Sequence, residues 1–414
     1  MVKVSDIEDR DSLEAWLLDR PEDETKRFAI AIAHRAAMRV LPIYWEWVGR
    51  SRVAKKHELT PLPILQCNLT SGIACITPTP EIRDAAGLAF SFATTDTSVV
   101  SADIASADDE TDTGVSSSAK AAIAAAGTAY ETGIHVAIIT SAADIASDSV
   151  AEVVSSDSTS AFWKQIWNDC NALQNKDILL AAPLWNGNVN PLQKEWDVVR
   201  QSLPVATSVR SEETARGAVP VDWSFWIKWY QDALEGREPD WDILAEIALI
   251  PDEDWEKGPA HINNQVIAGI VGKYRLLREV QELRKELAAV RQTATAAPMG
   301  HNNPPEGIEA QAEVVTQTEI IWAALEEAEE ELSKPEPSPS VLKRIGNAIL
   351  GAAKKVMKYS VGLLDIALKS AAKEGGATFG KWGARGVIAW IAVQNPHLVS
   401  LGQQLIEYAN SLRK

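Results

Sequence analysis

Apolar residues recur every three or four positions along most of this chain, which is the spacing of one face of an α-helix. The clearest series consists of tryptophans three residues apart, at Trp223, Trp226 and Trp229. Gly236 and Pro239 break that helix, and Asp240 is a suitable N-cap for a second helix that stops before Pro251. The pattern predicts a tight helical hairpin with an aromatic seam.

The tryptophans of this hairpin are predicted to form structural core: Trp223, Trp226, Trp229 and Trp241. Each buried tryptophan removes roughly 150–250 Å² of surface from water, so the seam can anchor whatever packs on it. A ligand cage is the alternative, and core is favoured because most buried aromatic side chains serve packing.

Two later apolar series, with alternating spacings of three and four, predict helices that pair with each other. The first lies between residues 276 and 290 and is rich in Arg and Lys. The second lies between residues 318 and 332 and carries five glutamates from position 326 to position 331. Because opposite charges attract across the Pro-rich link, we expect an antiparallel helical hairpin over residues 276–332.

The C-terminal part of the chain predicts a long cationic amphipathic helix from Leu342 to Lys373, with lysines opposite its apolar face. An apolar stretch around Trp390 follows, Pro396 is expected to end it, and a last helix comes after. Candidate residues for contact with a membrane or an acidic partner are Lys354, Lys358, Lys369, Lys373, Trp382 and Trp390.

Earlier segments are less regular. A helix that begins at Pro21 is expected to run to Pro42. Its histidine, His34, is expected to be packed or half-exposed rather than a ligand, because no second ligand lies nearby. Residues 61–80 are β-branched and punctuated by prolines, and they predict two short strands or an irregular connection. Residues 96–160 are rich in Ala, Ser, Thr and Asp. They are interpreted as helical, and a partly disordered insert is the alternative.

The predicted fold class is mainly α, as a multi-segment helical protein. Its expected segments are an N-terminal helical region (1–95), an acidic Ala/Ser/Thr/Asp-rich segment (96–160), a Trp-rich helical body with a long helix (161–292), a Pro-rich loop with an acidic helix and hinge (293–340), and a basic amphipathic helical tail (341–414).

Charge is divided unevenly along the chain, whose net charge is −17. Residues 341–414 carry 11 basic and 3 acidic side chains, a net +8, so residues 1–340 carry −25. An acidic body argues against nucleic-acid binding. A basic amphipathic helix is typical of segments that lie on an anionic membrane or bind an acidic protein. We also expect the tail to dock on the acidic body at low salt.

The cysteines and the N-terminus bear on location. Cys67, Cys75 and Cys170 are odd in number and widely spaced, which suits a reducing compartment. No apolar run follows the first charges, and no stretch reaches ~18 uninterrupted apolar residues. We therefore expect a cytoplasmic protein, with a peripheral place at the inner membrane if the tail binds lipid.

Patterns for catalysis are weak. Gly375 to Lys381 matches G-x-x-x-x-G-K, but Trp382 stands where Ser or Thr should hold Mg²⁺, and no strand precedes it. Ser370-x-x-Lys373 lacks its partner motifs. The six histidines have no second ligand at metal spacing. We expect no catalytic residue, metal or cofactor, although acidic pairs from distant segments would leave no sequence trace.

One resemblance is carried by the tryptophan block DWSFWIKWY…DWD…DWEKGP together with the later GHNNPPE linker. These segments resemble a family of uncharacterised alphaproteobacterial proteins. The resemblance spans residues 160–414 and leaves out the Ala-rich middle. It implies a bacterial accessory protein and brings no known activity, cofactor or catalytic residue to this chain.

These observations predict a non-catalytic binding protein whose basic C-terminal module engages an anionic membrane surface or an acidic protein. A toxin- or defence-type accessory effector is one form of that function. A soluble helical scaffold without a membrane role is the alternative, and an enzyme with an unrecognised site is the third.

Overall fold

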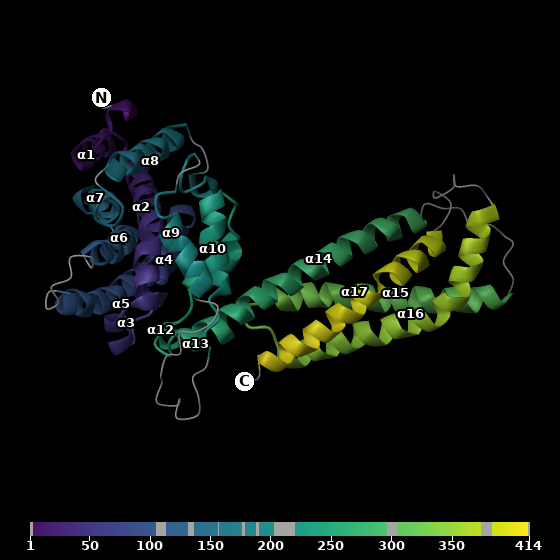
Figure 1. Cartoon of the computed structure of the whole chain (residues 1–414). Coiled ribbons are helices and arrows are strands. Elements are labelled where there is room, and N and C mark those ends of the chain that lie inside the picture. The colour runs from purple at the N-terminus through teal and green to yellow at the C-terminus, as the bar shows by residue number, and fades with distance from the viewer. Residues whose placement is uncertain are drawn as a thin grey trace. The chain divides into compact units, whose positions relative to one another are not determined.

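The computed structural model describes residues 3–104, 113–130, 136–155, 157–175, 179–187, 190–202, 220–295, 305–373 and 383–412. Within these ranges every regular element is helical and none is a strand, so the predicted mainly α class is confirmed (Figure 1). The chain divides into two compact units, an N-terminal unit (Met1–Ile267) and a C-terminal unit (Ala268–Lys414).

The N-terminal unit is organised around α2 (Glu22–Arg50), which contacts α4, α6, α7, α8 and α9. Its other elements are η1 (Val4–Asp6), α1 (Arg10–Leu18), α3 (Arg52–Lys56), α4 (Leu62–Ile76), α5 (Pro80–Ile104), α6 (Thr113–Tyr130), α7 (Val136–Val153), α8 (Asp157–Gln174), η3 (Leu179–Ala181), α9 (Gln193–Ser202), α10 (Ser224–Glu235), α11 (Trp241–Ala248), α12 (Asp252–Trp255), α13 (Pro259–His261) and the π-helix η5 (Ile262–Ile267). Residues 96–160 are therefore helical wherever they are described, apart from the turn after α7.

Helix α2 continues through Pro42, where the sequence predicts a stop, so that expectation is wrong. A proline inside a helix removes one backbone hydrogen bond and costs about 3 kcal/mol or more. However, 21 of the 29 residues of α2 are buried, and they surround the helix on all sides. The free energy of that burial outweighs the cost of the proline.

The stretch 61–80 is also corrected, because it forms the helix α4 and the start of α5 rather than strands or an irregular connection. Nearly all of α4 is buried, and tertiary packing routinely overrides the weak helix propensity of β-branched residues. Some of its polar side chains bond back to their own helix, as when Asn68 Nδ2 donates to the Ile64 carbonyl and Thr70 Oγ1 donates to the Gln66 carbonyl. These bonds let polar side chains enter the core.

The tryptophan hairpin has the predicted form. Helix α10 ends at Gly236, which adopts a left-handed φ of +68°. Asp240 caps α11 by accepting a hydrogen bond from the Ile243 N–H. Trp226 Nε1 donates to Asn263 Oδ1 of the π-helix at 3.0 Å. The hairpin is thus fixed to the π-helix η5.

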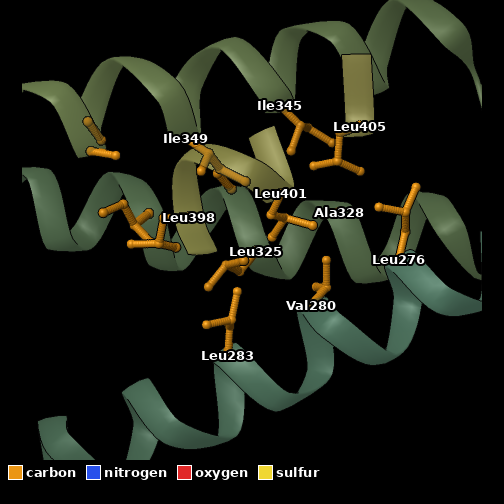
Figure 2. Close-up of a cluster of buried hydrophobic side chains, with 14 of the residues drawn as sticks. Leu276, Val280, Leu283, Leu325, Ala328, Ile345, Ile349, Leu398, Leu401 and Leu405 are labelled. Carbon is orange, nitrogen blue, oxygen red and sulfur yellow. The ribbon is translucent and has the colours of Figure 1, made fainter. Parts of the chain in front are cut away.

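The C-terminal unit consists of four long helices that run side by side in Figure 1: α14 (Ala268–Thr295), α15 (Pro305–Leu332), α16 (Pro339–Lys373) and α17 (Gly383–Ser411). Figure 2 shows side chains of all four helices pointing toward one another, including Leu283, Leu325, Ile349 and Leu401. The predicted α14–α15 hairpin is present. Ion pairs between its helices join Arg284 to Glu326 and Glu329, and Arg291 to Glu319.

One expectation for residues 341–414 is wrong, because helix α17 runs through Pro396 without a stop. The expected packing of the tail on residues 1–340 is present, since α16 and α17 complete one core with α14 and α15. Apolar packing holds this arrangement together, and packing of this kind does not depend on low salt. The ion pair between Arg344 and Glu327 is an addition to it.

The α16–α17 contact is closest at two glycines, and it yields a first prediction. A Cβ added to Gly346 would lie 2.6 Å from the Gly402 carbonyl oxygen, so Gly346→Ala must push the helices apart. Overpacking of this kind costs about 1–3 kcal/mol. We expect hydrogen exchange of the buried α16 and α17 amides to accelerate roughly tenfold to a hundredfold.

Gly351, one and a half turns further along α16, is the matched control because a Cβ there would meet nothing within 4 Å. Gly351→Ala should slow exchange slightly, since alanine favours a helix over glycine by up to about 1 kcal/mol. Equal effects of the two substitutions would contradict this account of the helix contact.

Candidate functional site

The basic helix α16 begins inside the bundle. Leu342, Ile345, Ile349 and Val356 of its apolar face are buried in the four-helix core. Lys354 lies on the opposite face and is exposed, as is its neighbour Lys355. The predicted amphipathic division is therefore real over this part of the helix, and another protein helix covers the apolar face.

Of the other candidate contact residues, Lys358, Lys369 and Lys373 belong to the helical backbone of α16, but their side chains lie outside the described part of the structure, as does Trp382. Trp390 is half-buried against the core, and its Nε1 donates to Glu286 Oε2 at 3.0 Å. Trp390 thus contacts α14 and stays partly exposed.

The charge division looks different once the helices are grouped by unit. Residues 268–414 carry 18 basic and 16 acidic side chains, because α15 contributes a run of glutamates to the same unit as the lysines. The positive charge of the tail is therefore largely balanced within its own unit. A site that attracts an anionic surface must therefore be a local group of positive charges, and the lysines of α16 form such a group.

The tryptophan block lies in the core of the N-terminal unit. Trp223, Trp226 and Trp229 are buried, and the rings of Trp226 and Trp229 stand edge to face at 5.6 Å between centroids. Trp241 is only half-buried. With Trp229 and His34 it lines a cavity of about 20 Å³, enough for little more than one water molecule. This volume favours core over a ligand cage.

Among the described residues that line this small cavity, His34 alone is ionisable, and its Nδ1 lies 3.1 Å from Ser71 Oγ. Burial, and then the positive charge of Arg35, lower the pKa of His34 to about 3. The imidazole is therefore neutral at physiological pH. Sequence analysis anticipated a packed or half-exposed histidine here.

The lowered pKa of His34 predicts a loss of stability in acid. Below the usual histidine pKa of about 6.5, the unfolded chain binds a proton at this position that the folded chain does not bind. Stability contributed by neutral His34 is complete above pH 6.5 and falls by about 1.4 kcal/mol per pH unit from there toward pH 3.

We expect His34→Gln, which keeps a hydrogen-bonding group for Ser71, to reduce the difference in unfolding free energy between pH 7.5 and pH 5.5 by about 1.4 kcal/mol. Urea unfolding at both pH values measures it. An unchanged pH dependence in the variant would show that His34 is protonated in the folded state.

A buried ionic cluster was missed by sequence analysis. Arg35 and Arg39 of α2 meet Asp169 of α8, with Nε–Oδ1 at 3.0 Å for Arg35 and Nη1–Oδ2 at 2.7 Å for Arg39. All three side chains are 2% exposed or less. Their remaining donors reach the chain between α8 and α9, at the carbonyls of Ala182, Pro183 and Leu184.

This cluster is structural rather than catalytic. Burial lowers the pKa of Arg35 to about 10 and Asp169 opposes that shift, so the guanidinium stays charged at neutral pH. With two cations, one anion and no access for a substrate, the cluster holds α2, α8 and residues 182–184 together. A sequence signal did exist: two arginines four residues apart within the mainly apolar middle of α2.

The described part of the chain has no cluster of metal-ligating side chains, since no group of three or more His, Cys, Asp or Glu side chains in it is placed to hold a metal ion. Likewise, none of its helices is long and apolar enough to cross a membrane. No protein family, curated protein or solved structure matches this chain. The family resemblance of the tryptophan block and the GHNNPPE linker thus stays a prediction.

Proposed function

We propose that this chain is a non-catalytic binding protein whose C-terminal unit contacts an anionic membrane surface through α16. The observation that carries the proposal is an exposed surface, here called the Lys354 surface: Lys354, Lys355, Met357 and Val393. Asn395 Nδ2 donates to the Ala353 carbonyl, which brings the α17 and α16 parts of this surface to the same level of the bundle.

The composition of the Lys354 surface suits a membrane interface. Met357, one helical turn from Lys354, is 43% exposed, and Val393 of α17 is 71% exposed. Apolar and basic groups together are typical of segments that lie on anionic lipid. The sequence of α16 adds Lys358, Lys369 and Lys373 against one acid, Asp365.

Because the core already covers the apolar face of α16 as far as Val356, contact would be peripheral and would leave the bundle folded. Each lysine near an anionic surface contributes about 1 kcal/mol. Such contact would place the chain at the cytoplasmic face of the inner membrane.

A soluble helical scaffold is the second candidate function, and one observation favours it. The apolar residues Leu342 to Val356 of α16 meet α15 and α17, which is what an ordinary bundle requires. In that case the lysines of α16 would only be solvated.

Flotation of the full-length protein with vesicles of defined charge separates the two functions. We expect binding to vesicles rich in phosphatidylglycerol at low salt and none to neutral phosphatidylcholine vesicles. Changing Lys354, Lys358, Lys369 and Lys373 together to Glu should weaken binding roughly a thousandfold, from four contributions of about 1 kcal/mol. The control carries the same change at exposed lysines of other helices: Lys55, Lys56, Lys164 and Lys285.

Three results would change the conclusion. Equal loss in the control would mean that net charge matters rather than the Lys354 surface. Failure of the unaltered protein to float with anionic vesicles would refute membrane contact and favour the scaffold. Binding to polyglutamate but not to vesicles would favour an acidic protein partner.

A further inference from the structure

A second cavity of the N-terminal unit lies between the start of α4, α5 and the end of α12, and its volume is about 100 Å³. Leu62, Pro63, Phe92 and Trp255 supply apolar walls. Trp255 Nε1 already donates to the Ile250 carbonyl at 3.1 Å, so this residue offers the cavity its ring and not a hydrogen bond.

Gln66 is the first polar group of this cavity. It is 3% exposed, and its side-chain amide forms no hydrogen bond with any residue that the structure describes. The amide atoms of Gln66 are not among the fully buried side-chain atoms that lack a partner, so they reach the water-accessible space of the cavity. Other polar side chains of α4, such as Asn68 and Thr70, bond back to their own helix, whereas that of Gln66 does not.

Glu256 is the second polar group, and it is exposed, so it stands where the cavity meets solvent. It forms no ion pair with the residues described. Two further acids, Asp252 and Glu253, lie close by, and burial together with the carboxylates of Glu253 and Glu256 raises the pKa of Asp252. Negative charge thus gathers at the entrance to an aromatic cavity.

We propose that this cavity binds a small organic ammonium ion. Its apolar part would lie against Phe92 and Trp255, and its cationic head would donate to Gln66 Oε1 and face the Glu256 carboxylate. Aromatic ring faces attract such cations as well. A cavity of about 150 Å³ accommodates benzene, so one of about 100 Å³ suits a body of about four or five carbons. This site is independent of the proposed membrane contact, which involves the other unit.

Ligand-observed NMR titration of the full-length protein tests the proposal with three probes of matched length: n-butylammonium, n-butanol and butyrate. We expect saturable binding of n-butylammonium with a Kd in roughly the millimolar range, as suits so small a ligand. Butanol should bind at least about fivefold more weakly, because it lacks the charge that faces Glu256. Butyrate should not bind.

Variants distinguish the two polar groups. Glu256 is exposed, so Glu256→Gln should leave the fold intact. This variant should bind n-butylammonium about fivefold more weakly and butanol with unchanged affinity. Gln66→Leu should weaken the binding of n-butylammonium about tenfold. Glu253→Gln, an exposed neighbour that does not line the cavity, is the control and should have less than a twofold effect.

Equal affinity for n-butylammonium and butanol would overturn the proposal, as would an unchanged affinity in the Glu256→Gln variant. Absence of saturable binding of any probe would show that the cavity holds only water.

Discussion

Replacing Asp169 by asparagine is expected to lower the free energy of unfolding by about 3–5 kcal/mol. The substitution keeps the shape of the side chain and removes the one negative charge between two buried guanidinium groups. Their carbonyl partners at residues 182–184 are dipoles and do not replace a full charge. Taking out one partner of a buried ionic cluster leaves an uncompensated charge in a medium of low dielectric constant.

Urea unfolding followed by tryptophan fluorescence measures this effect, since 12 of the 15 tryptophans lie in residues 1–267 and report mainly on the N-terminal unit. Asp197→Asn is the control. Asp197 pairs with Arg200 on the surface, and an exposed pair contributes about 0–1 kcal/mol. If both variants unfold at the same urea concentration, the buried cluster does not stabilise the unit as proposed.

Trp226→Ala is expected to destabilise the N-terminal unit by about 3–5 kcal/mol, the range for deleting a buried large aromatic side chain. Trp226 is fully buried, its ring contacts those of Phe225 and Trp229, and its Nε1 binds Asn263. The alanine variant loses the packing and leaves the Asn263 oxygen without its partner. The same fluorescence-detected unfolding experiment applies.

Phe225 is the matched control, because it is the neighbouring aromatic residue of α10 and is only half-buried. Phe225→Ala should therefore cost clearly less than Trp226→Ala. Trp226→Phe should fall between wild type and Trp226→Ala, since it restores much of the volume and not the hydrogen bond. A Trp226→Ala protein with an unchanged unfolding curve would refute the core assignment.

Local patterns predicted much of this fold. The glycine that ends α10, the aspartate that caps α11, and the opposite charges of α14 and α15 all act within one helix or between neighbouring helices. Spacing and residue type therefore report on them directly. Residue spacing likewise predicted the apolar face of α16.

Residue spacing did not predict which elements pack against that face, because spacing shows only that a face is apolar and not what covers it. The same limit explains the other errors. Local propensities predict stops at Pro42 and Pro396 and a non-helical stretch at residues 61–80, and long-range packing overrides those propensities. Asp169 gave no signal, since its partners lie 130 and 134 residues away along the chain. The cavity between Gln66 and Glu256 joins helices from three separate segments, and no motif spans it.

The arginines of α2 have a consequence for how this sequence can vary. They bind residues 182–184 through carbonyl oxygens, which every amino acid possesses. A substitution at Ala182 thus leaves the acceptor in place, whereas a single substitution at Arg35, Arg39 or Asp169 disturbs a buried ionic cluster. Selection that preserves this contact therefore acts on the side chains of α2 and α8 and not on those of residues 182–184. A search for relatives that gives most weight to residues 182–184 would therefore rely on positions whose side chains this contact does not constrain.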